Sequence, residues 1–280
     1  MESLLTRPEI QSAVLPFVIA LALALGLRRL TTTAWLWALF TAFTVSALLI
    51  NGFTLTPLTG TRKIILLLSA ALLSAALLPG VLSKLRLQRP FIDLFCLLAL
   101  AWVFWVVLAR MPSEQIAIHA AGFITLLVIL QQSFERVSGN PAQLHGAGLS
   151  LLLGVGLSAT AAASALLGQL ALALAAASGG AYLAWVIAGS APSATGGKQP
   201  VVTLPYLLAA LLLGLASVVF ARLPWYALIP LALIPLVVSL VPVKSESRFA
   251  RALLASLPGL VIALAVAFWV WQSGSSDSGY

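Results

Sequence analysis

Charged residues are scarce in this chain. Of its 280 residues, 15 are Lys or Arg and seven are Asp or Glu, so only 8% carry a charge. A soluble domain needs about 25% charged residues to keep its surface hydrated. The shortage therefore excludes a soluble globular protein. Together with a hydrophobic content of 61%, it predicts an integral membrane protein with little mass outside the bilayer.

Groups that usually carry enzyme chemistry are also few. The single cysteine, Cys96, cannot form a disulfide or a thiolate metal site within one chain. The sequence holds neither the G-x-S-x-G pattern of serine hydrolases nor the H-E-x-x-H pattern of zinc proteases. All four lysines fall outside the apolar runs. We therefore expect no catalytic activity, metal or resident cofactor, with a bound lipid, quinone or carotenoid as the open alternative.

The net charge of +8 has two interpretations. Nucleic-acid binding needs a contiguous basic surface, but no run of Lys and Arg provides one. Basic residues in short loops between apolar segments are instead typical of membrane proteins, whose cytoplasmic loops retain positive charge. We expect membrane lipids and other membrane protein subunits as partners, and no nucleic acid.

Apolar segments of about 18–20 residues recur along the chain, the length that crosses a hydrocarbon core of about 30 Å. We predict an all-α, polytopic transmembrane helix bundle of about ten spans, with eight or nine as alternatives. It forms a single domain, 1–271, followed by a short, polar, disordered tail, 272–280. The predicted spans are 10–27, 34–53, 64–82, 91–109, 115–133, 144–165, 169–188, 201–221, 225–241 and 252–271.

The basic residues divide unequally between the two sides of a ten-span chain. The richer side belongs in the cytoplasm, which places both termini outside, in a cell membrane that we expect to be the bacterial inner membrane. The richer side carries Arg28, Arg29, Lys84, Arg86, Arg89, Arg136, Lys198, Lys244, Arg248 and Arg251, and the poorer side carries Arg7, Arg62, Lys63, Arg110 and Arg222.

Two ionisable residues inside the predicted spans are candidate functional groups, because polar groups in a bilayer are costly. Asp93 could bind a proton or a cation that enters from the cytoplasm. The favoured alternative is a carboxylate in a first helical turn, close to Arg86 and Arg89. His119 could be a proton relay or a metal ligand. Its favoured alternative is an interfacial histidine bonded to a neighbouring backbone carbonyl.

The densest polar patch follows at the inner end of the fifth predicted span. Gln131 and Glu135 are four residues apart and so share a helix face. They could line a vestibule or contact a partner. The alternative that we favour is a helix that simply emerges into water.

The fourth predicted span has an aromatic face. Phe91, Phe95, Trp102 and Trp105 fall on one side of a helix, and the predicted span places the two tryptophans deep in the membrane. This face could be a docking surface for a partner helix, a quinone, a carotenoid or a lipid tail. The alternative is ordinary lipid-facing or core aromatic packing.

Small residues recur at a spacing of four in the sixth and seventh predicted spans, which a short turn joins into a hairpin. Such spacing lets helix backbones approach closely. We expect these residues to pack inside the molecule rather than against another chain. They are Gly154, Ser158 and Ala162 in the sixth span and Ala171, Ala175 and Gly179 in the seventh.

The sequence thus predicts a non-enzymatic membrane protein, either a subunit or scaffold of a larger complex or, as the alternative, a small transporter or channel for a weakly polar or lipophilic solute. A carrier requires Asp93, His119 or Gln131 to face a common aqueous cavity. A scaffold requires a dry interior and an apolar surface that other subunits cover.

Overall fold

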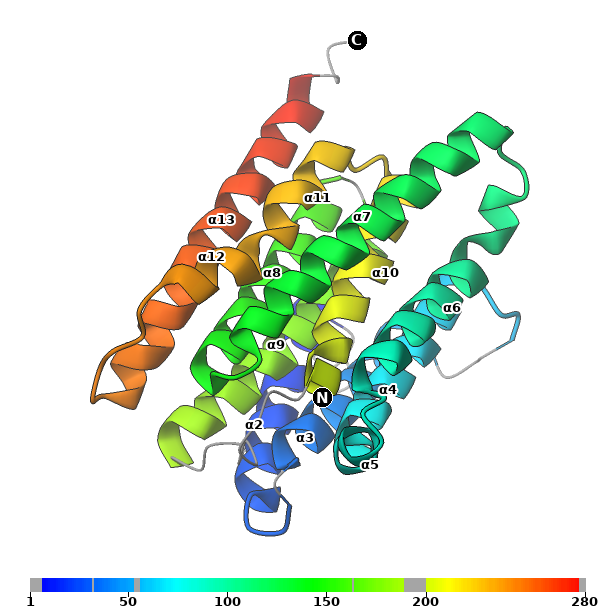
Figure 1. Cartoon of the computed structure of the whole chain (residues 1–280). Coiled ribbons are helices and arrows are strands. Elements are labelled where there is room, and N and C mark those ends of the chain that lie inside the picture. The colour runs from blue at the N-terminus through cyan, green and yellow to red at the C-terminus, as the bar shows by residue number, and fades with distance from the viewer. Residues whose placement is uncertain (1–6, 32, 53–55, 163, 189–199, 277–280) are drawn as a thin grey trace.

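The computed structural model describes residues 7–31, 33–52, 56–162, 164–188 and 200–276. Within these residues every regular element is a helix (Figure 1). The predicted all-α fold class is therefore confirmed. Nine helices of the described residues are long and apolar enough to cross a membrane, which makes the chain a multi-pass membrane protein.

The helices follow one another with short connections. In chain order they are η1 (Ile10–Val14), which is a π-helical segment continuous with α2, then α2 (Leu15–Leu27), α3 (Ala34–Asn51), α4 (Gly60–Leu77), α5 (Pro79–Lys84), α6 (Gln88–Leu108), α7 (Ser113–Val137), α8 (Pro141–Ala161), α9 (Ala165–Ala188), the 3-10 turn η2 (Pro200–Thr203), α10 (Leu204–Ala221), α11 (Trp225–Ala232), α12 (Ile234–Leu240) and α13 (Arg248–Ser276).

Local sequence signals set several helix ends. Asn140 caps α8, because its side-chain oxygen accepts hydrogen bonds from the backbone N–H groups of Ala142 and Gln143 at 3.0 and 3.4 Å. Pro141 follows at the first helical position, where its missing N–H has no cost. Pro79 ends α4 and begins α5. Cap and proline signals therefore fix where these helices begin, but not which helices they pack against.

Aromatic contacts identify two ends of the bundle. At one end, Trp35 of α3 contacts His145 of α8, which stacks on Tyr182 of α9. At the other end, His119 near the start of α7 contacts Trp225, the first residue of α11. We call the first the basic end and the second the opposite end. The described basic residues at the basic end are Arg28, Arg29, Lys84, Arg86, Arg89, Arg136, Lys244, Arg248 and Arg251.

Further contacts at the opposite end show that successive helices alternate in direction. Phe104, late in α6, stacks on Phe220, late in α10, with ring centroids 6.0 Å apart. Tyr226 of α11 lies 4.5 Å from Trp269, late in α13. The nine long helices of the described residues fall within the predicted range of eight to ten spans. Trp225–Leu240, which holds α11 and α12, is a shorter apolar segment, so a tenth crossing stays a prediction. Lys198, which the sequence assigns to the basic side, lies outside the described residues.

The ninth predicted span, 225–241, is a broken helix. α11 and α12 meet at Leu233, between Pro230 and Pro235. Proline cannot donate a backbone hydrogen bond and its ring crowds the preceding turn, so two prolines five residues apart interrupt the helix. The pair still runs along α13 (Figure 1).

The chain after the last span differs from its prediction. α13 continues to Ser276, so residues 272–276, which the sequence assigned to a disordered tail, are helical. The predicted tail residues 277–280 lie outside the described residues. Helix propagation from an already formed span adds one hydrogen bond per residue, which explains why a polar segment joined to α13 keeps its helical form.

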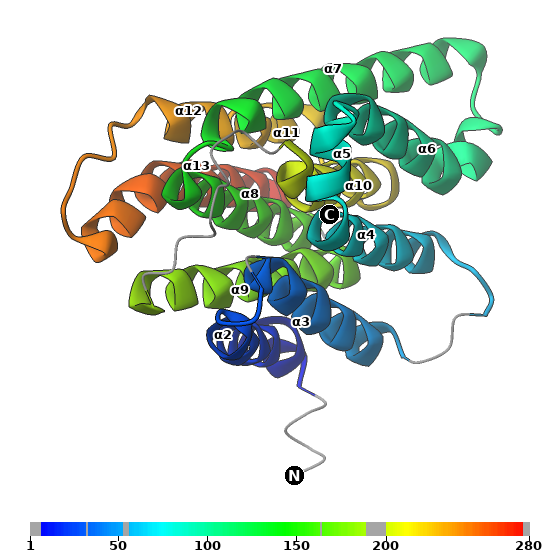
Figure 2. The same cartoon turned by 60° about the horizontal axis from the view of Figure 1, so that its bottom comes forward.

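α8 and α10 occupy the centre of the bundle. Of the residues in their candidate membrane-spanning segments, 72% in α8 and 78% in α10 are buried, compared with 33% in α6 and 33% in α13. Figure 2 shows α8 between α9 on one side and α7, α12 and α13 on the other. The core is thus organised around two helices from the second half of the chain.

Very small residues bring α8 and α13 into backbone contact. A Cβ atom added to Gly146 would lie 2.8 Å from the carbonyl oxygen of Ala255, and one added to Gly259 would lie 2.7 Å from Cβ of Ser150. The hydroxyl of Ser150 also donates to the carbonyl of Ser256 at 3.2 Å. Close approach of this kind gives membrane helices most of their packing energy.

Candidate functional site

Five side chains fill the interior near the basic end. We call them the His145 cluster: Trp35 from α3, His145 from α8, Ser178 and Tyr182 from α9, and Tyr206 from α10. His145, Ser178 and Tyr206 are fully buried, and Trp35 and Tyr182 are 8% and 6% exposed. A buried polar group in a membrane bundle needs a partner from the protein itself. Because Trp35 comes from α3 and the other four side chains come from α8, α9 and α10, the cluster joins helices from both halves of the chain.

Three of these side chains form a hydrogen-bonded chain. The hydroxyl of Ser178 lies 3.0 Å from the hydroxyl of Tyr206, which lies 3.4 Å from Nδ1 of His145. A hydroxyl both donates and accepts, whereas a neutral imidazole has one N–H and one bare nitrogen. The chain is therefore able to run in either direction. The second ring nitrogen, Nε2, is buried and has no hydrogen-bonding partner among the described residues.

Aromatic rings surround the imidazole. The ring of Trp35 stands at 83° to that of His145 with centroids 4.7 Å apart, and the ring of Tyr182 stacks on it at 5.5 Å. Behind Tyr206, the ring of Phe134 from α7 stacks at 6.1 Å. Trp35 and Tyr182 therefore enclose the imidazole between two aromatic rings, one at an edge-to-face angle and one stacked.

The backbone makes room for this arrangement. Gly148 lies against Tyr206, and an added Cβ would come within 2.6 Å of the tyrosine ring. The hydroxyl of Tyr182 lies 3.1 Å from the carbonyl oxygens of both Ala142 and Ala252 and donates to them. Tyr182 therefore links α9 to the first turns of α8 and α13, and holds the second aromatic wall in place.

Asp93 and Glu135, predicted as candidate polar sites, lie outside this cluster. Asp93 is half-buried on α6, and it forms no hydrogen bond or ion pair within the described part of the chain. Arg89, expected beside Asp93, instead pairs with Glu135 of α7, with Nε and Oε1 3.2 Å apart. Because Arg89 is 59% exposed, solvent screens this pair and it adds little stability.

The other two predicted polar residues also lie apart. His119 is at the opposite end, where its Nδ1 lies 2.8 Å from the carbonyl oxygen of Gln115 and its ring is 5.8 Å from that of Trp225. The contact with Gln115 agrees with the favoured alternative, a histidine that is bonded to a neighbouring backbone carbonyl. Gln131 is half-buried on α7, and its Nε2 has no partner among the described residues. The structure does not bring Asp93, His119 and Gln131 together in a common site.

The aromatic face of α6 points outward in part. Phe91 and Phe95 are half-buried, whereas Trp102 and Trp105 are 43% and 69% exposed. Lys63, in the first turn of α4, donates to the carbonyl of Trp102 at 3.1 Å, and its ammonium lies 5.5 Å from the indole ring. Trp102 is therefore level with the first turn of α4, which carries a charge. Its deep position in the membrane stays a prediction.

The predicted small residues lie inside the bundle, on several different contacts. Gly154 faces Ala263 of α13, at 3.1 Å from an added Cβ, and Gly179 is 3.6 Å from Leu149 by the same measure. The close contact between α8 and α9 within the hairpin is made by residues that were not among those predicted. Gly168 of α9 contacts Thr160 of α8. Of the remaining predicted residues, Ser158, Ala171 and Ala175 are buried and Ala162 is half-buried.

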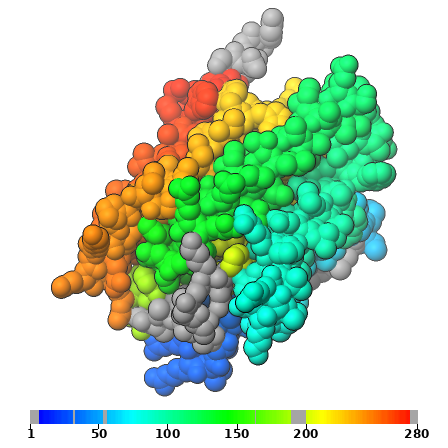
Figure 3. Space-filling view, viewed as in Figure 1, coloured from blue at the N-terminus to red at the C-terminus, as the bar shows by residue number. Residues whose placement is uncertain are grey.

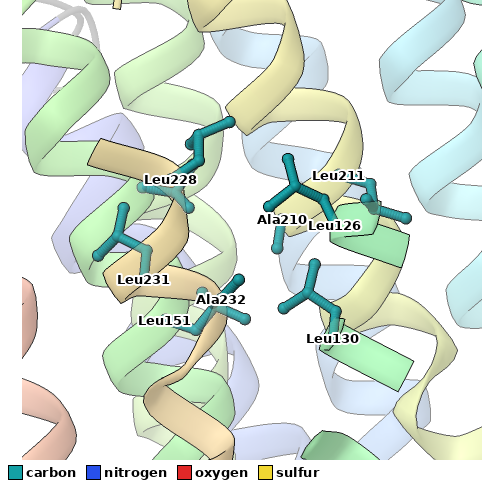
Figure 4. A pocket seen from close by; sticks show the side chains of 9 residues that line it. Leu126, Leu130, Leu151, Ala210, Leu211, Leu228, Leu231 and Ala232 are labelled. Atoms are coloured by element: carbon teal, nitrogen blue, oxygen red, sulfur yellow. The ribbon is translucent and has the colours of Figure 1, made fainter. Parts of the chain in front are cut away.

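One cleft lies in the middle of the bundle, where the broken helix passes α7, α8 and α10. Its volume is only about 10 Å³, and only apolar side chains line it (Figure 4). The side chains that the broken helix contributes are Leu228, Leu231 and Ala232. A larger groove of about 240 Å³, lined by Thr61, Ser164 and Phe220 among others, lies at the opposite end.

Sequence reasoning missed the His145 cluster. His145 is the second residue of the sixth predicted span, 144–165, but the pattern of small residues in that span does not show that its side chain faces inward. The available signal was a histidine beside Gly146 and Gly148, because small neighbours allow other helices to close over a polar side chain.

No family model matches this chain, and no curated protein or solved structure shows significant similarity to it.

Proposed function

We propose that the chain is a non-enzymatic, membrane-embedded subunit or scaffold of a larger assembly. The observation that carries this proposal is the outward face of α6, where Leu94, Leu98 and Trp105 are 59%, 61% and 69% exposed. α6 lies at the edge of the bundle, and both α6 and α7 reach the surface in Figure 3. A broad apolar face on a peripheral helix fits a neighbouring transmembrane helix, which would fill its grooves better than mobile lipid tails.

The interior supports the same proposal. A carrier must separate helices around its substrate site as it changes access. Here, α8 is in backbone contact with α13 at Gly146. The side-chain amide of Gln143 donates to the carbonyls of Val238 and Val241, at 3.2 and 3.1 Å. Movement of α8 would break these contacts, so a body that keeps one arrangement suits the geometry better.

The orientation follows from charge. We propose that the basic end faces the cytoplasm and that the opposite end, with both chain termini, faces outward. The membrane potential and anionic lipids both favour positive loops on the cytoplasmic side. Membrane lipids and other integral membrane subunits are the proposed partners; catalysis, a resident cofactor and nucleic-acid binding form no part of the proposed role.

Alanine at Leu98 and Trp105 together is expected to release the partner, because it removes most of the apolar contact area of this face. The fraction of chain that elutes in a high-mass particle after mild detergent extraction should fall at least several-fold. The matched control replaces Leu253 and Leu257, which are 52% and 51% exposed on α13, and should leave that fraction unchanged. Equal behaviour of the two double variants would reject α6 as the contact surface.

A transporter for a lipophilic solute is the second candidate, and the apolar cleft beside the broken helix favours it. Interrupted helices near the middle of a bundle often form substrate sites in carriers. Here, the interruption at Leu233 adjoins a cleft lined by Leu228 and Leu231. The cleft would have to widen from its volume of about 10 Å³ to admit a solute, and because its lining is apolar the solute would be apolar.

Filling the cleft tests this candidate. Leu231→Trp adds bulk where Leu231 is 1% exposed and should abolish flux of a lipophilic dye into vesicles that contain the protein. Leu240→Trp, at a residue that is 69% exposed, is the matched control and should transport normally. Flux that is the same with Leu231→Trp, or the same in vesicles without protein, would eliminate transport through the cleft.

A further inference from the structure

We propose that the His145 cluster is a proton-binding site, with His145 as the acceptor and the hydronium ion, which leaves as water, as the source of the proton. This role goes beyond that of a scaffold and does not depend on it. Histidine inside a membrane bundle is rare and commonly marks a proton pathway or site. The proposal rests on the contacts that the two ring nitrogens make.

The hydrogen-bonded chain can accommodate the additional proton. In the neutral state one ring nitrogen has a lone pair, and the hydroxyl of Tyr206 can donate to it at Nδ1. When a hydronium ion gives its proton to the ring and leaves as water, both ring nitrogens become donors. Nδ1–H then donates to the oxygen of Tyr206, and the Tyr206 hydroxyl turns to donate to Ser178, 3.0 Å away. The only covalent bond that breaks is the O–H bond of the hydronium ion.

The aromatic walls can stabilise the charge that the proton brings. A cation within about 6 Å of an aromatic centroid is attracted by the electron-rich face of the ring. The centroids of Trp35 and Tyr182 lie 4.7 and 5.5 Å from that of His145. The imidazole therefore lies within this distance of two aromatic rings, while its Nε2 has no hydrogen-bonding partner among the described residues.

No carboxylate contacts His145 in the described structure. The groups that face it are Trp35 from α3, Ser178 and Tyr182 from α9, and Tyr206 from α10. The nearest charged residues along the neighbouring helices are Glu135, which follows Phe134 on α7, and Arg251, which precedes Ala252 on α13. Glu135 is paired with Arg89. A proton on His145 would therefore be held by hydroxyl and ring contacts and not by an ion pair.

Nitrogen-15 NMR of the whole chain in lipid nanodiscs measures the protonation state of the ring directly. Because the sequence has two histidines, His119→Ala leaves the signals of His145 alone. We expect the signals of a neutral imidazole to give way reversibly to those of an imidazolium as the pH is lowered to the most acidic value at which the protein stays folded. Signals of a neutral ring over the whole range, in a folded protein, would overturn the proposal.

Tyr206→Phe separates a proton site from a merely buried histidine. It keeps the aromatic ring but removes the hydroxyl that accepts from Nδ1–H, and a hydrogen bond to a charged group is the stronger kind. Proton affinity at His145 should fall by about tenfold. Ser217→Ala, which removes a buried hydroxyl of α10 that donates only within its own helix, is the matched control. An equal affinity in both variants would show that Tyr206 does not hold the protonated ring.

Trp35 gives a second signal that does not require labelling. An adjacent imidazolium quenches indole emission, so the difference in fluorescence between wild type and Trp35→Phe should fall on acidification. His145→Asn keeps a polar side chain of similar reach and should abolish this fall. A fall of the same size in His145→Asn would assign the effect to another group and contradict the proposal.

Discussion

Gly180→Ala is expected to destabilise the protein by about 1–3 kcal/mol, the usual cost of forcing atoms into a packed core. An added Cβ at Gly180 would collide with the backbone carbonyl of Phe17 and lie 3.1 Å from the backbone nitrogen of Leu21. Backbone atoms cannot swing aside as a side chain can, so α2 must move away from α9. Titration with a denaturing detergent, followed by loss of helical circular dichroism, gives the free energy of unfolding.

The neighbouring glycine provides the control. At Gly179 the nearest atom to an added Cβ is a side-chain carbon of Leu149 at 3.6 Å, an ordinary contact. Gly179→Ala should therefore change the free energy of unfolding by no more than about 0.5 kcal/mol. Equal stability of the two variants would mean that α2 does not pack against α9 as described.

Gly146→Ala is expected to have an effect of similar size at the centre of the bundle, about 1–3 kcal/mol. Its added Cβ would lie 2.8 Å from the carbonyl oxygen of Ala255 and 3.1 Å from the backbone nitrogen of Ser256. Separation of α8 from α13 would also weaken the Ser150 hydrogen bond to Ser256. The same detergent titration measures the loss.

Gly26→Ala is the matched control for this variant. Nothing lies within 4 Å of an added Cβ at Gly26, near the end of α2. Alanine is the better helix former, so this substitution should raise stability by about 0.5–1 kcal/mol. If Gly146→Ala were as stable as Gly26→Ala, α8 and α13 would not be in backbone contact.

The membrane fold could be predicted from the sequence because the thickness of the bilayer fixes the length of an apolar helix. The Asn140–Pro141 cap and the break at Pro79 likewise act within a few residues of where they occur. The same local physics explains the broken ninth span, since Pro230 and Pro235 interrupt α11–α12 whatever surrounds them, and the end of α4 at Pro79, inside the third predicted span, 64–82.

The contacts between helices could not be predicted in the same way. The spacing of four between Gly154 and Ser158 shows that one face of the helix carries small side chains, but it does not show which helix packs against that face. Gly180, which makes a close backbone contact with α2, lies one residue after the stripe that ends at Gly179. Gly146, which contacts the backbone of α13, lies eight residues before Gly154, on the same stripe but ahead of the part singled out. The role of His145 could not be predicted for the same reason, because its contacts Trp35 and Tyr206 are far from it in the sequence.

The mass of the particle that the chain forms in its own membrane tests the central claim most directly. Membranes extracted with a polymer that keeps native lipids around each protein should yield a particle heavier than one 29.3 kDa chain with its lipids, and a second membrane polypeptide should be present in fixed proportion. A particle that contains one copy of this chain and lipid alone would contradict the assignment of the protein as a subunit of a larger assembly.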